Sequence, residues 1–259
     1  MGILNITPDS FYDGGLYFDY SKALKKADKI IEEGADIIDI GGESTRPGSS
    51  PIKASEEIKR ITPIIEAIAK KNKIKISVDT YKSEVAKAAI ESGATMINDI
   101  SGFTFDKKMP SLIAAQNVEV VLMHIKGTPK NMQNNPNYSN LLDDVYNFLK
   151  KAVRQAENKG IKKEKIIVDP GIGFGKTMED NYKIINNLSK FKGLSGQLLI
   201  GLSRKSLIGK LYNSEEDRLP ATIALNTTAI LKGADLIRVH DVKAHRLALD
   251  SLAMLKKVS

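Results

Sequence analysis

Short apolar runs alternate with amphipathic helical segments along the whole chain. Eight such runs occur in 259 residues, and a segment with helical periodicity follows each one. A short continuous apolar run indicates a strand buried on both faces, which is typical of parallel sheets. Eight strand–helix repeats predict closure into a (β/α)8 TIM barrel, and we expect a single α/β domain over residues 1–259. An open, doubly wound sheet is the alternative fold.

The expected elements follow one another with few long gaps. The expected strands cover residues 2–6, 36–40, 74–79, 95–99, 118–124, 166–168, 198–200 and 235–240. The expected helices cover residues 21–33, 54–71, 82–92, 108–117, 141–159, 179–190, 218–232 and 241–257. Gly34, Gly93 and Gly160 end three of these helices, because a helix C-terminus favours a residue that adopts the left-handed conformation. Two long polar segments, residues 7–20 and 125–140, are expected to be loops.

Composition argues against several classes of protein. No apolar run approaches the roughly 18 residues of a membrane span, and no signal segment opens the chain. The absence of cysteine argues against disulfides, thiol catalysis and Cys-based metal sites, and it favours a reducing cytoplasm. The net charge of +8 invites a nucleic-acid hypothesis, but the lysines are scattered along helices without interleaved aromatic residues. We therefore expect neither a nucleic acid nor a membrane as partner.

Polar residues stand at the end of almost every expected strand. In (β/α)8 barrels, chemistry collects at the C-terminal ends of the strands and in the loops that follow them. These positions hold Asn5, Glu43, Ser44, Thr45, Arg46, Asp79, Asn98, Asp99, His124, Asp169, Lys205, Arg238 and His240. Each residue alone has a structural explanation, such as a helix N-cap or an Asx turn. Together they predict one site at the mouth of the barrel.

The residue types in this set suit a flat heterocycle and an anion. The acceptors and donors available to a ring are Asp79, Asn98, Asp169 and Lys205. A buried carboxylate can accept two parallel N–H bonds from a guanidine-like edge, and an arginine can stack on such a ring. A phosphate or diphosphate can be surrounded by Asn5, Arg46, Arg238 and His240. No His/Cys cluster has transition-metal spacing, so a metal would be a hard, oxygen-bound ion such as Mg²⁺.

The strand-end motifs resemble those of the dihydropteroate synthase family. The resemblance rests on the segments ILNITPDSF (3–11), DIGGESTRPG (39–48), SVDT (77–80), INDISG (97–102), LMH (122–124), DPGIGFGK (169–176), SRKS (203–206) and RVHD (238–241). It implies a barrel transferase of folate biosynthesis, which joins 6-hydroxymethyl-7,8-dihydropterin diphosphate to 4-aminobenzoate and releases diphosphate. It also implies inhibition by sulfonamides and a homodimer.

The resemblance further implies roles for particular residues. Substrate binding would involve Phe11, Thr45, Pro47, Asp79, Asn98, Ile100, Met123, Asp169, Phe174, Lys205, Ser206, Arg238, Val239 and His240. Catalysis would depend on Asp13, Arg46, Lys205, Arg238 and His240. Asn5 would bind Mg²⁺ beside the diphosphate, and the loops that carry Phe11, Asp13 and residues 45–47 would close over the mouth. Aminobenzoate and sulfonamides would lie near Pro47, Phe174, Lys205 and Ser206.

Two other functions are compatible with a pterin barrel. A methyltransferase that acts on methyltetrahydrofolate would share the pterin carboxylate and asparagine, and it would transfer a methyl group to a cobalamin carrier. A non-catalytic pterin-binding barrel is the second alternative. The motifs at residues 7–11 and 203–206 argue against the first, and the intact Asn5, Arg46, Lys205 and His240 argue against the second. No Ser–His–Asp arrangement is evident, so we expect no covalent nucleophile.

Overall fold

The barrel strands form one continuous parallel sheet. The computed structural model describes residues 1–7, 12–13, 17–18, 20–209, 211–212 and 214–257. The sheet order follows the chain, with every neighbouring pair parallel. Its strands are β1 (Gly2–Asn5), β4 (Ile37–Gly41), β5 (Lys75–Asp79), β6 (Met96–Asp99), β7 (Glu119–Met123), β8 (Ile166–Asp169), β9 (Gln197–Ile200) and β10 (Leu236–Ile237).

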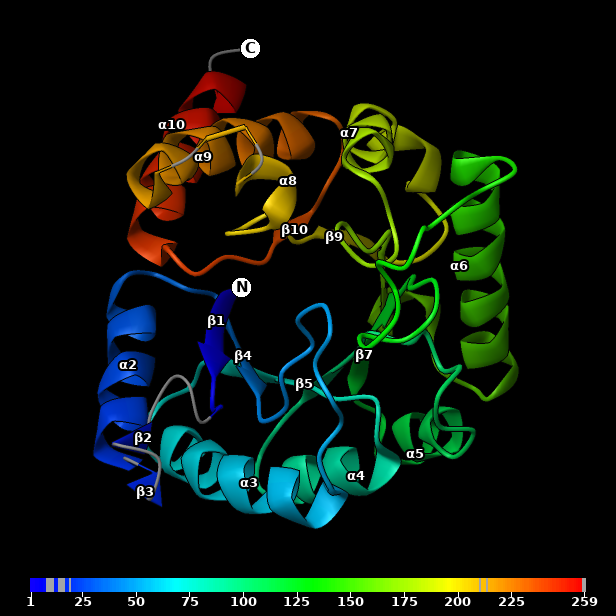
Figure 1. Ribbon diagram of the computed structural model, residues 1–259. Helices are drawn as coiled ribbons and strands as arrows, with labels where there is room; N and C mark the ends of the chain where they lie inside the picture. The colour runs from blue at the N-terminus through cyan, green and yellow to red at the C-terminus, as the bar shows by residue number, and fades with distance from the viewer. Residues whose placement is uncertain (8–11, 14–16, 19, 210, 213, 258–259) are drawn as a thin grey trace.

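The last strand meets the first and closes the sheet. Gly2 and Val239 form a parallel bridge, the Ile3 N–H donates to the Val239 carbonyl at 2.9 Å, and the Val239 N–H donates to the Met1 carbonyl at 2.9 Å. Figure 1 shows the strands as an inner ring with the helices around it. The predicted (β/α)8 barrel is confirmed, and the open sheet is wrong.

Helices separate the barrel strands and cover the outside of the ring. They are α2 (Tyr20–Glu32), α3 (Ala54–Lys71), α4 (Ser83–Glu91), α5 (Met109–Gln116), α6 (Leu141–Asn158), α7 (Met178–Asn186), α8 (Ser206–Gly209), α9 (Glu215–Leu231) and α10 (Val242–Lys257). In the described part of the chain, no helix is long and apolar enough to cross a membrane.

The structure adds short elements that the sequence did not predict. β2 (Tyr12–Asp13) and β3 (Tyr17–Phe18) pair as antiparallel strands inside a segment that was expected to be a loop. The expected helix 179–190 ends at Asn186 and is followed by a 3-10 helix, η2 (Leu188–Phe191). A second 3-10 helix, η1 (Lys163–Lys165), precedes β8, and α8 was not expected. Helix α9 begins earlier than expected, because the Ser214 side chain caps its first turn.

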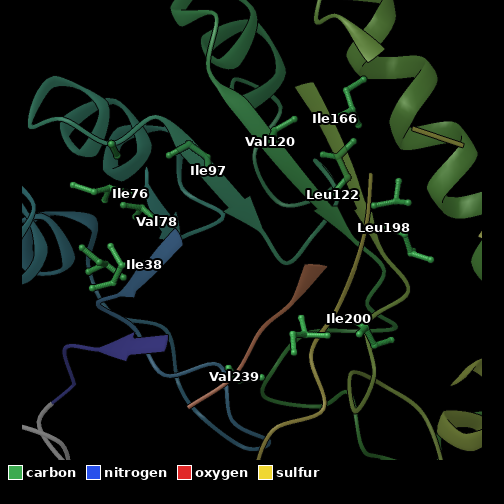
Figure 2. Close-up of a cluster of buried hydrophobic side chains, with 14 of the residues drawn as sticks. Ile38, Ile76, Val78, Ile97, Val120, Leu122, Ile166, Leu198, Ile200 and Val239 are labelled. Carbon is green, nitrogen blue, oxygen red and sulfur yellow. The ribbon is translucent and has the colours of Figure 1, made fainter. Parts of the chain in front are cut away.

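Alternation along the strands divides the apolar side chains into two layers. One position points to the helices and the next points into the barrel. The outward side chains form the main core, and Figure 2 labels ten of them, including Ile38, Ile76 and Val120. The inward side chains near the start of the strands form a separate apolar layer inside the barrel, made of Met1, Ile37, Met96, Val121, Ile167 and Leu199, with Leu236 packed against it. This inner layer is the floor on which the site is built.

Candidate active site

The site lies one step along the strands from the apolar floor. Because inward positions recur every second residue, the residue two places after each floor residue also points into the barrel. These positions hold Ile3, Asp39, Asn98, Met123, Asp169, Gly201 and Arg238. Asp79 occupies the inward position of β5, next to Gly41 and Asn98 in the strand register. Strand periodicity and closure of the barrel thus bring together Asp79, Asn98, Asp169 and Arg238, which the sequence singled out.

Arg238 lies between two buried aspartates. Its Nε donates to Asp39 Oδ2 at 2.6 Å, and its Nη2 donates to Asp79 Oδ2 at 2.8 Å. Asp39 also accepts from Asn98 Nδ2 at 3.1 Å and from Ser77 Oγ at 2.6 Å. Asp39 therefore fixes both the guanidinium of Arg238 and the amide of Asn98. Asp79 Oδ1 is buried without a hydrogen-bond partner, so it is an acceptor available to a ligand.

Sequence reasoning missed Asp39. The sequence pattern presents Asp39 as part of an apolar strand, whereas the structure makes it the fully buried anchor of the site. The alternation of side chains along β4 contains a signal for this role. Ile37, Asp39 and Gly41 share one buried face of the strand, and a carboxylate on a buried face needs hydrogen-bond or ionic partners. Its main partner, Arg238, is 199 residues away in the chain, so the pairing is a consequence of barrel closure.

Asp169 and Lys205 share a glycine-rich loop, residues 170–176. Asp169 Oδ1 accepts the N–H of Gly171 at 2.7 Å. Lys205 Nζ donates to the carbonyl of Ile172 and lies 4.8 Å from the centroid of the Phe174 ring, within the range of a cation–π contact. Three of the predicted ligand contacts are therefore held by one loop.

A buried lysine organises the same loop. Lys176 Nζ lies 2.8 Å from His124 Nδ1, and it donates to the Gly171 carbonyl at 2.8 Å and to the Phe174 carbonyl at 3.0 Å. When Lys176 is charged, its third proton bonds Nδ1, and the neutral ring of His124 then carries its proton on Nε2. Gly171 has φ +71, and a Cβ there would stand 1.9 Å from the His124 carbonyl oxygen. His124 therefore has a structural role in this loop.

Burial shifts the protonation equilibria of the site toward neutral pH. It raises the pKa of Asp79 to about 7 in spite of the attraction of Arg238, and it raises the pKa of Asp169 in the same direction. It lowers the pKa of Lys205 to about 8 and that of Lys176 to about 7. Burial also opposes the charge of Arg238, but Asp39 and Asp79 raise its pKa overall. The guanidinium of Arg238 therefore stays charged. The charge states of Asp79 and Lys205, by contrast, depend on pH and on each other.

Asp79→Asn is expected to gain stability relative to the wild type as the pH rises. The folded-state pKa of Asp79 is raised from 3.8 to about 7, so its stabilising contribution is complete below the unfolded value and is lost as the pH rises through about 7. Asparagine lacks this contribution, so the difference in the free energy of unfolding should grow by up to about 1.4 kcal/mol per pH unit. Urea unfolding of both proteins at about pH 5 and about pH 8 measures it. A difference that is constant over this interval would contradict the raised pKa.

His240 has a serine partner that the sequence did not reveal. Its backbone N–H donates to Ser203 Oγ at 3.2 Å, and its Nδ1 lies 3.0 Å from the same oxygen. A hydroxyl has one proton and two acceptor lone pairs, so Ser203 Oγ can donate to Nδ1 or accept from an Nδ1–H while it accepts the backbone N–H. Burial and the nearby Arg238 lower the pKa of His240 to about 3. His240 is therefore neutral near pH 7, and it lines a cavity of about 460 Å³ together with Lys26, Lys29 and Arg204.

The structure also places the remaining predicted residues. Ile100 and Met123 form one buried apolar cluster, and Phe174 packs against it. Ser206 is exposed at the start of α8, directly after Lys205. Val239 is not brought to the site, because its side chain points outward into the main core (Figure 2).

The residues expected at the mouth lie on separate segments. Thr45 is half-buried, and Arg46 and Pro47 are exposed, on the segment between β4 and α3. Asn5 is half-buried at the end of β1. Asp13 belongs to the short strand β2, and Phe11 lies outside the described residues. Among the described residues, no group of three or more His, Cys, Asp or Glu side chains is placed to hold a metal.

A closed (β/α)8 barrel with paired aspartates, an amide, a lysine and an arginine at its strand ends defines an enzyme-like site for a polar heterocycle. Residues 1–240 match the family described as pterin binding enzyme. The chain belongs to this pterin-binding family, and within it to the dihydropteroate synthases, as the following relatives show.

Two curated relatives cover nearly the whole chain. The dihydropteroate synthase of Clostridium beijerinckii is 49% identical over 244 residues, covering 93% of this chain and 88% of the relative. That of Bacillus subtilis is 47% identical over 261 residues, covering 99% of this chain and 88% of the relative.

Solved structures resemble the whole fold. Yersinia pestis dihydropteroate synthase with a sulfonamide drug complex has a TM-score of 0.92 at 39% identity, covering 99% of this chain and 93% of the other. The Xanthomonas albilineans enzyme with 4-aminobenzoic acid has a TM-score of 0.91 at 39% identity, covering 100% and 93%. The same enzyme in complex with 7,8-dihydropteroate has a TM-score of 0.88 at 37% identity, covering 98% and 92%.

Proposed function

We propose that this chain is a dihydropteroate synthase, a transferase that condenses 6-hydroxymethyl-7,8-dihydropterin diphosphate with 4-aminobenzoate. The observation that carries the proposal is the cluster of Asp79, Asn98, Asp169 and Lys205 around Arg238 at the strand ends. Relatives of the same family and fold were solved with 4-aminobenzoic acid and with 7,8-dihydropteroate, the second substrate and the product of this reaction.

The strand-end carboxylates supply the recognition of the pterin ring. Asp79 Oδ1 is buried and has no hydrogen-bond partner. In Asp169, the oxygen that accepts the Gly171 N–H is Oδ1. Both can accept N–H groups from the guanidine-like edge of the ring, while Lys205 donates to its acceptor atoms. Arg238 is held by Asp39, so its guanidinium is fixed before the ring arrives and can stack on it. Ile100 and Met123 supply apolar walls.

The chemistry requires charge stabilisation rather than a covalent nucleophile. The bond between the pterin methylene carbon and the diphosphate oxygen breaks, and its electron pair leaves with diphosphate. The nitrogen of the arylamine then bonds the methylene carbon and loses a proton to water. Arg46, Arg238 and the neutral His240 are the donors we assign to the leaving anion, because preorganised donors stabilise charge that develops in the transition state. A role for Asp13 near the methylene stays a prediction.

Asn5 is the residue that we assign to Mg²⁺. Its Oδ1 lies beside Gly41, where an added Cβ would come within 3.6 Å of it, so the glycine leaves room next to this oxygen. Mg²⁺ prefers oxygen ligands, keeps several waters and takes substrate phosphates, so one amide oxygen beside a diphosphate fits it. When bound, the ion would supply neutralisation of the charge on the leaving diphosphate.

Aminobenzoate and sulfonamides are assigned to the surface beside Phe174 and Lys205. The ammonium of Lys205 lies over the Phe174 ring, and Ser206 is exposed next to it. A carboxylate or sulfonyl group can accept from a lysine or hydroxyl there, while the aromatic ring packs on Phe174 and Pro47. The Yersinia pestis relative, solved with a sulfonamide drug, supports the assignment of these inhibitors.

Purified protein is expected to release diphosphate only when the pterin diphosphate, 4-aminobenzoate and Mg²⁺ are all present. Chelation of the metal should stop release, and added Mg²⁺ should restore it, because the leaving group needs charge neutralisation. A coupled assay for diphosphate, with one component omitted at a time, measures this. Methyl transfer from methyltetrahydrofolate to cobalamin, or pterin binding without any release, would instead favour one of the two alternative functions.

We also propose a cytoplasmic homodimer. Leu231, Leu247 and Met254 are large apolar side chains exposed on the neighbouring helices α9 and α10, and we expect a partner to cover them. The absence of cysteine agrees with a reducing compartment. A second copy of the chain is the partner that we assign to this face.

A further inference from the structure

A buried carboxylate closes the segment between β4 and α3 at its base. Glu43 opens this segment, and its Oε2 accepts the backbone N–H of Ile52 at 2.8 Å. The same oxygen accepts from Lys82 Nζ at 2.6 Å, and Oε1 accepts from the Tyr81 hydroxyl at 2.6 Å. One side chain thus joins the two ends of residues 43–52, which we call the mouth loop.

Lys82 completes this anchor. Its Nζ donates to Glu43 Oε2, to Glu57 Oε2 at 2.7 Å and to the Ile52 carbonyl at 2.8 Å, so all three donors of the ammonium are used. The side chain of Lys82 is 17% exposed, against 5% for Glu43 and 1% for Glu57. Burial opposes the charge of Lys82, but its bonds to Glu43 and Glu57 raise its pKa overall. The ammonium therefore stays charged near neutral pH and ties the mouth loop to α3 and α4.

A second contact holds the tip of the mouth loop. The Gly48 N–H donates to the carbonyl of Pro129, at 3.0 Å, in the segment between β7 and α6. Gly48 has φ +84, a conformation that favours glycine, and it lies inside the turn that the Ser49 N–H closes by donating to the Arg46 carbonyl at 3.0 Å. The predicted contact residues Thr45, Arg46 and Pro47 therefore lie between a fixed base and a fixed tip. Figure 1 shows this segment reaching over the middle of the ring of strands.

We propose that Glu43 and Lys82 are positioning residues, which hold the mouth loop in the conformation that presents Arg46 to the diphosphate and Pro47 to the aminobenzoate. The inference rests on the proposed function. A loop that is ordered before binding spares the substrates the conformational entropy of ordering it. The contacts assigned to the pterin ring come from the strand ends instead, so loss of the anchor should affect the two parts of the site unequally.

The test compares Lys82→Met with Lys87→Met. Methionine keeps the apolar stem but removes the ammonium. Lys87 is an exposed lysine in α4, the helix that Lys82 directly precedes, and its Nζ lies 3.9 Å from Glu91 Oε1. For Lys82→Met we expect the KM for 4-aminobenzoate and for the pterin diphosphate to rise and kcat/KM to fall on the order of 100-fold, a size typical of misplaced positioning groups. Binding of 6-hydroxymethylpterin, which lacks the diphosphate, should stay near the wild-type value by calorimetry. Lys87→Met should match the wild type throughout.

A second variant and a second measurement distinguish loss of the anchor from a general folding defect. Glu43→Gln keeps the size of the side chain and a carbonyl acceptor for the Ile52 N–H, so it should give the same selective loss to a smaller degree. Amide hydrogen exchange over residues 44–52 of the unliganded protein should accelerate in Lys82→Met and Glu43→Gln and not in Lys87→Met. This measurement needs no turnover.

Two results would overturn the proposal. One is unchanged exchange in the mouth loop of both variants. The other is an equal loss of affinity for 6-hydroxymethylpterin and for 4-aminobenzoate, which would indicate general damage to the barrel. If the wild-type protein forms no dihydropteroate, the proposed function falls, and the roles of Glu43 and Lys82 as anchors are then decided by the exchange data alone.

Discussion

Asp169→Asn is expected to weaken binding of the pterin diphosphate by about 10- to 150-fold. The carboxylate is buried at the end of β8 and is assigned to the N–H groups of the ring, and a hydrogen bond to a charged group contributes about 1.5–3 kcal/mol. The substitution also removes the negative charge that supports the charged form of Lys205. Isothermal titration of the pterin diphosphate against the wild type and the variant measures the loss.

A matched control separates this effect from a change of net charge. Glu179→Gln removes one negative charge from an exposed side chain in the first turn of α7, close in the chain to the glycine-rich loop. It should bind the pterin diphosphate as the wild type does. The barrel of Asp169→Asn should unfold near the wild-type temperature, since asparagine can still accept the Gly171 N–H. Wild-type affinity in Asp169→Asn would remove this carboxylate from the recognition of the ring.

Arg238→Met is expected to lower the free energy of unfolding by about 3–5 kcal/mol, since it leaves a buried ion network without its cation. Asp39 is fully buried and Asp79 nearly so, and each has a short bond to the guanidinium. The variant should also lose its activity, because the same guanidinium is assigned to the ring and the anion. Urea unfolding monitored by circular dichroism measures the stability.

A double-mutant cycle tests whether the loss comes from the uncompensated carboxylates. Asp39→Asn together with Arg238→Met should be more stable than Arg238→Met alone, because the buried Asp39 carboxylate no longer lacks a positive partner. The recovery should be partial, since Asp79 still lacks its partner. Strictly additive losses in the double variant would contradict a direct interaction between Asp39 and Arg238.

The barrel could be predicted from the sequence because its signals are local. Each apolar run indicates a buried strand by itself. Eight strand–helix repeats, each of which leads to the next parallel strand, permit few topologies. The same locality explains why Asp79, Asn98, Asp169 and Lys205 were recognised as one site. They follow directly on their strands, and parallel strands bring their ends to the same edge of the barrel.

The missed features depend on contacts between distant segments. Asp39 is revealed as an anchor only when barrel closure brings Arg238 to it, and Ser203 meets His240 only because β9 and β10 are neighbours. Lys82 bonds Glu43 across 39 residues of chain. The outward position of Val239 follows from the register of β10, in which only two residues are regularly paired. The sequence pattern could not show this register.

The central claim is that this barrel forms the bond between the pterin methylene carbon and the amine of 4-aminobenzoate. The most direct measurement supplies purified protein with the pterin diphosphate, Mg²⁺ and 4-aminobenzoate labelled with nitrogen-15 on the amine, and identifies the product by mass spectrometry. The account predicts 7,8-dihydropteroate that carries the label, formed in step with the diphosphate released. Diphosphate release that leaves the labelled aminobenzoate unchanged, or no release at all, would contradict it.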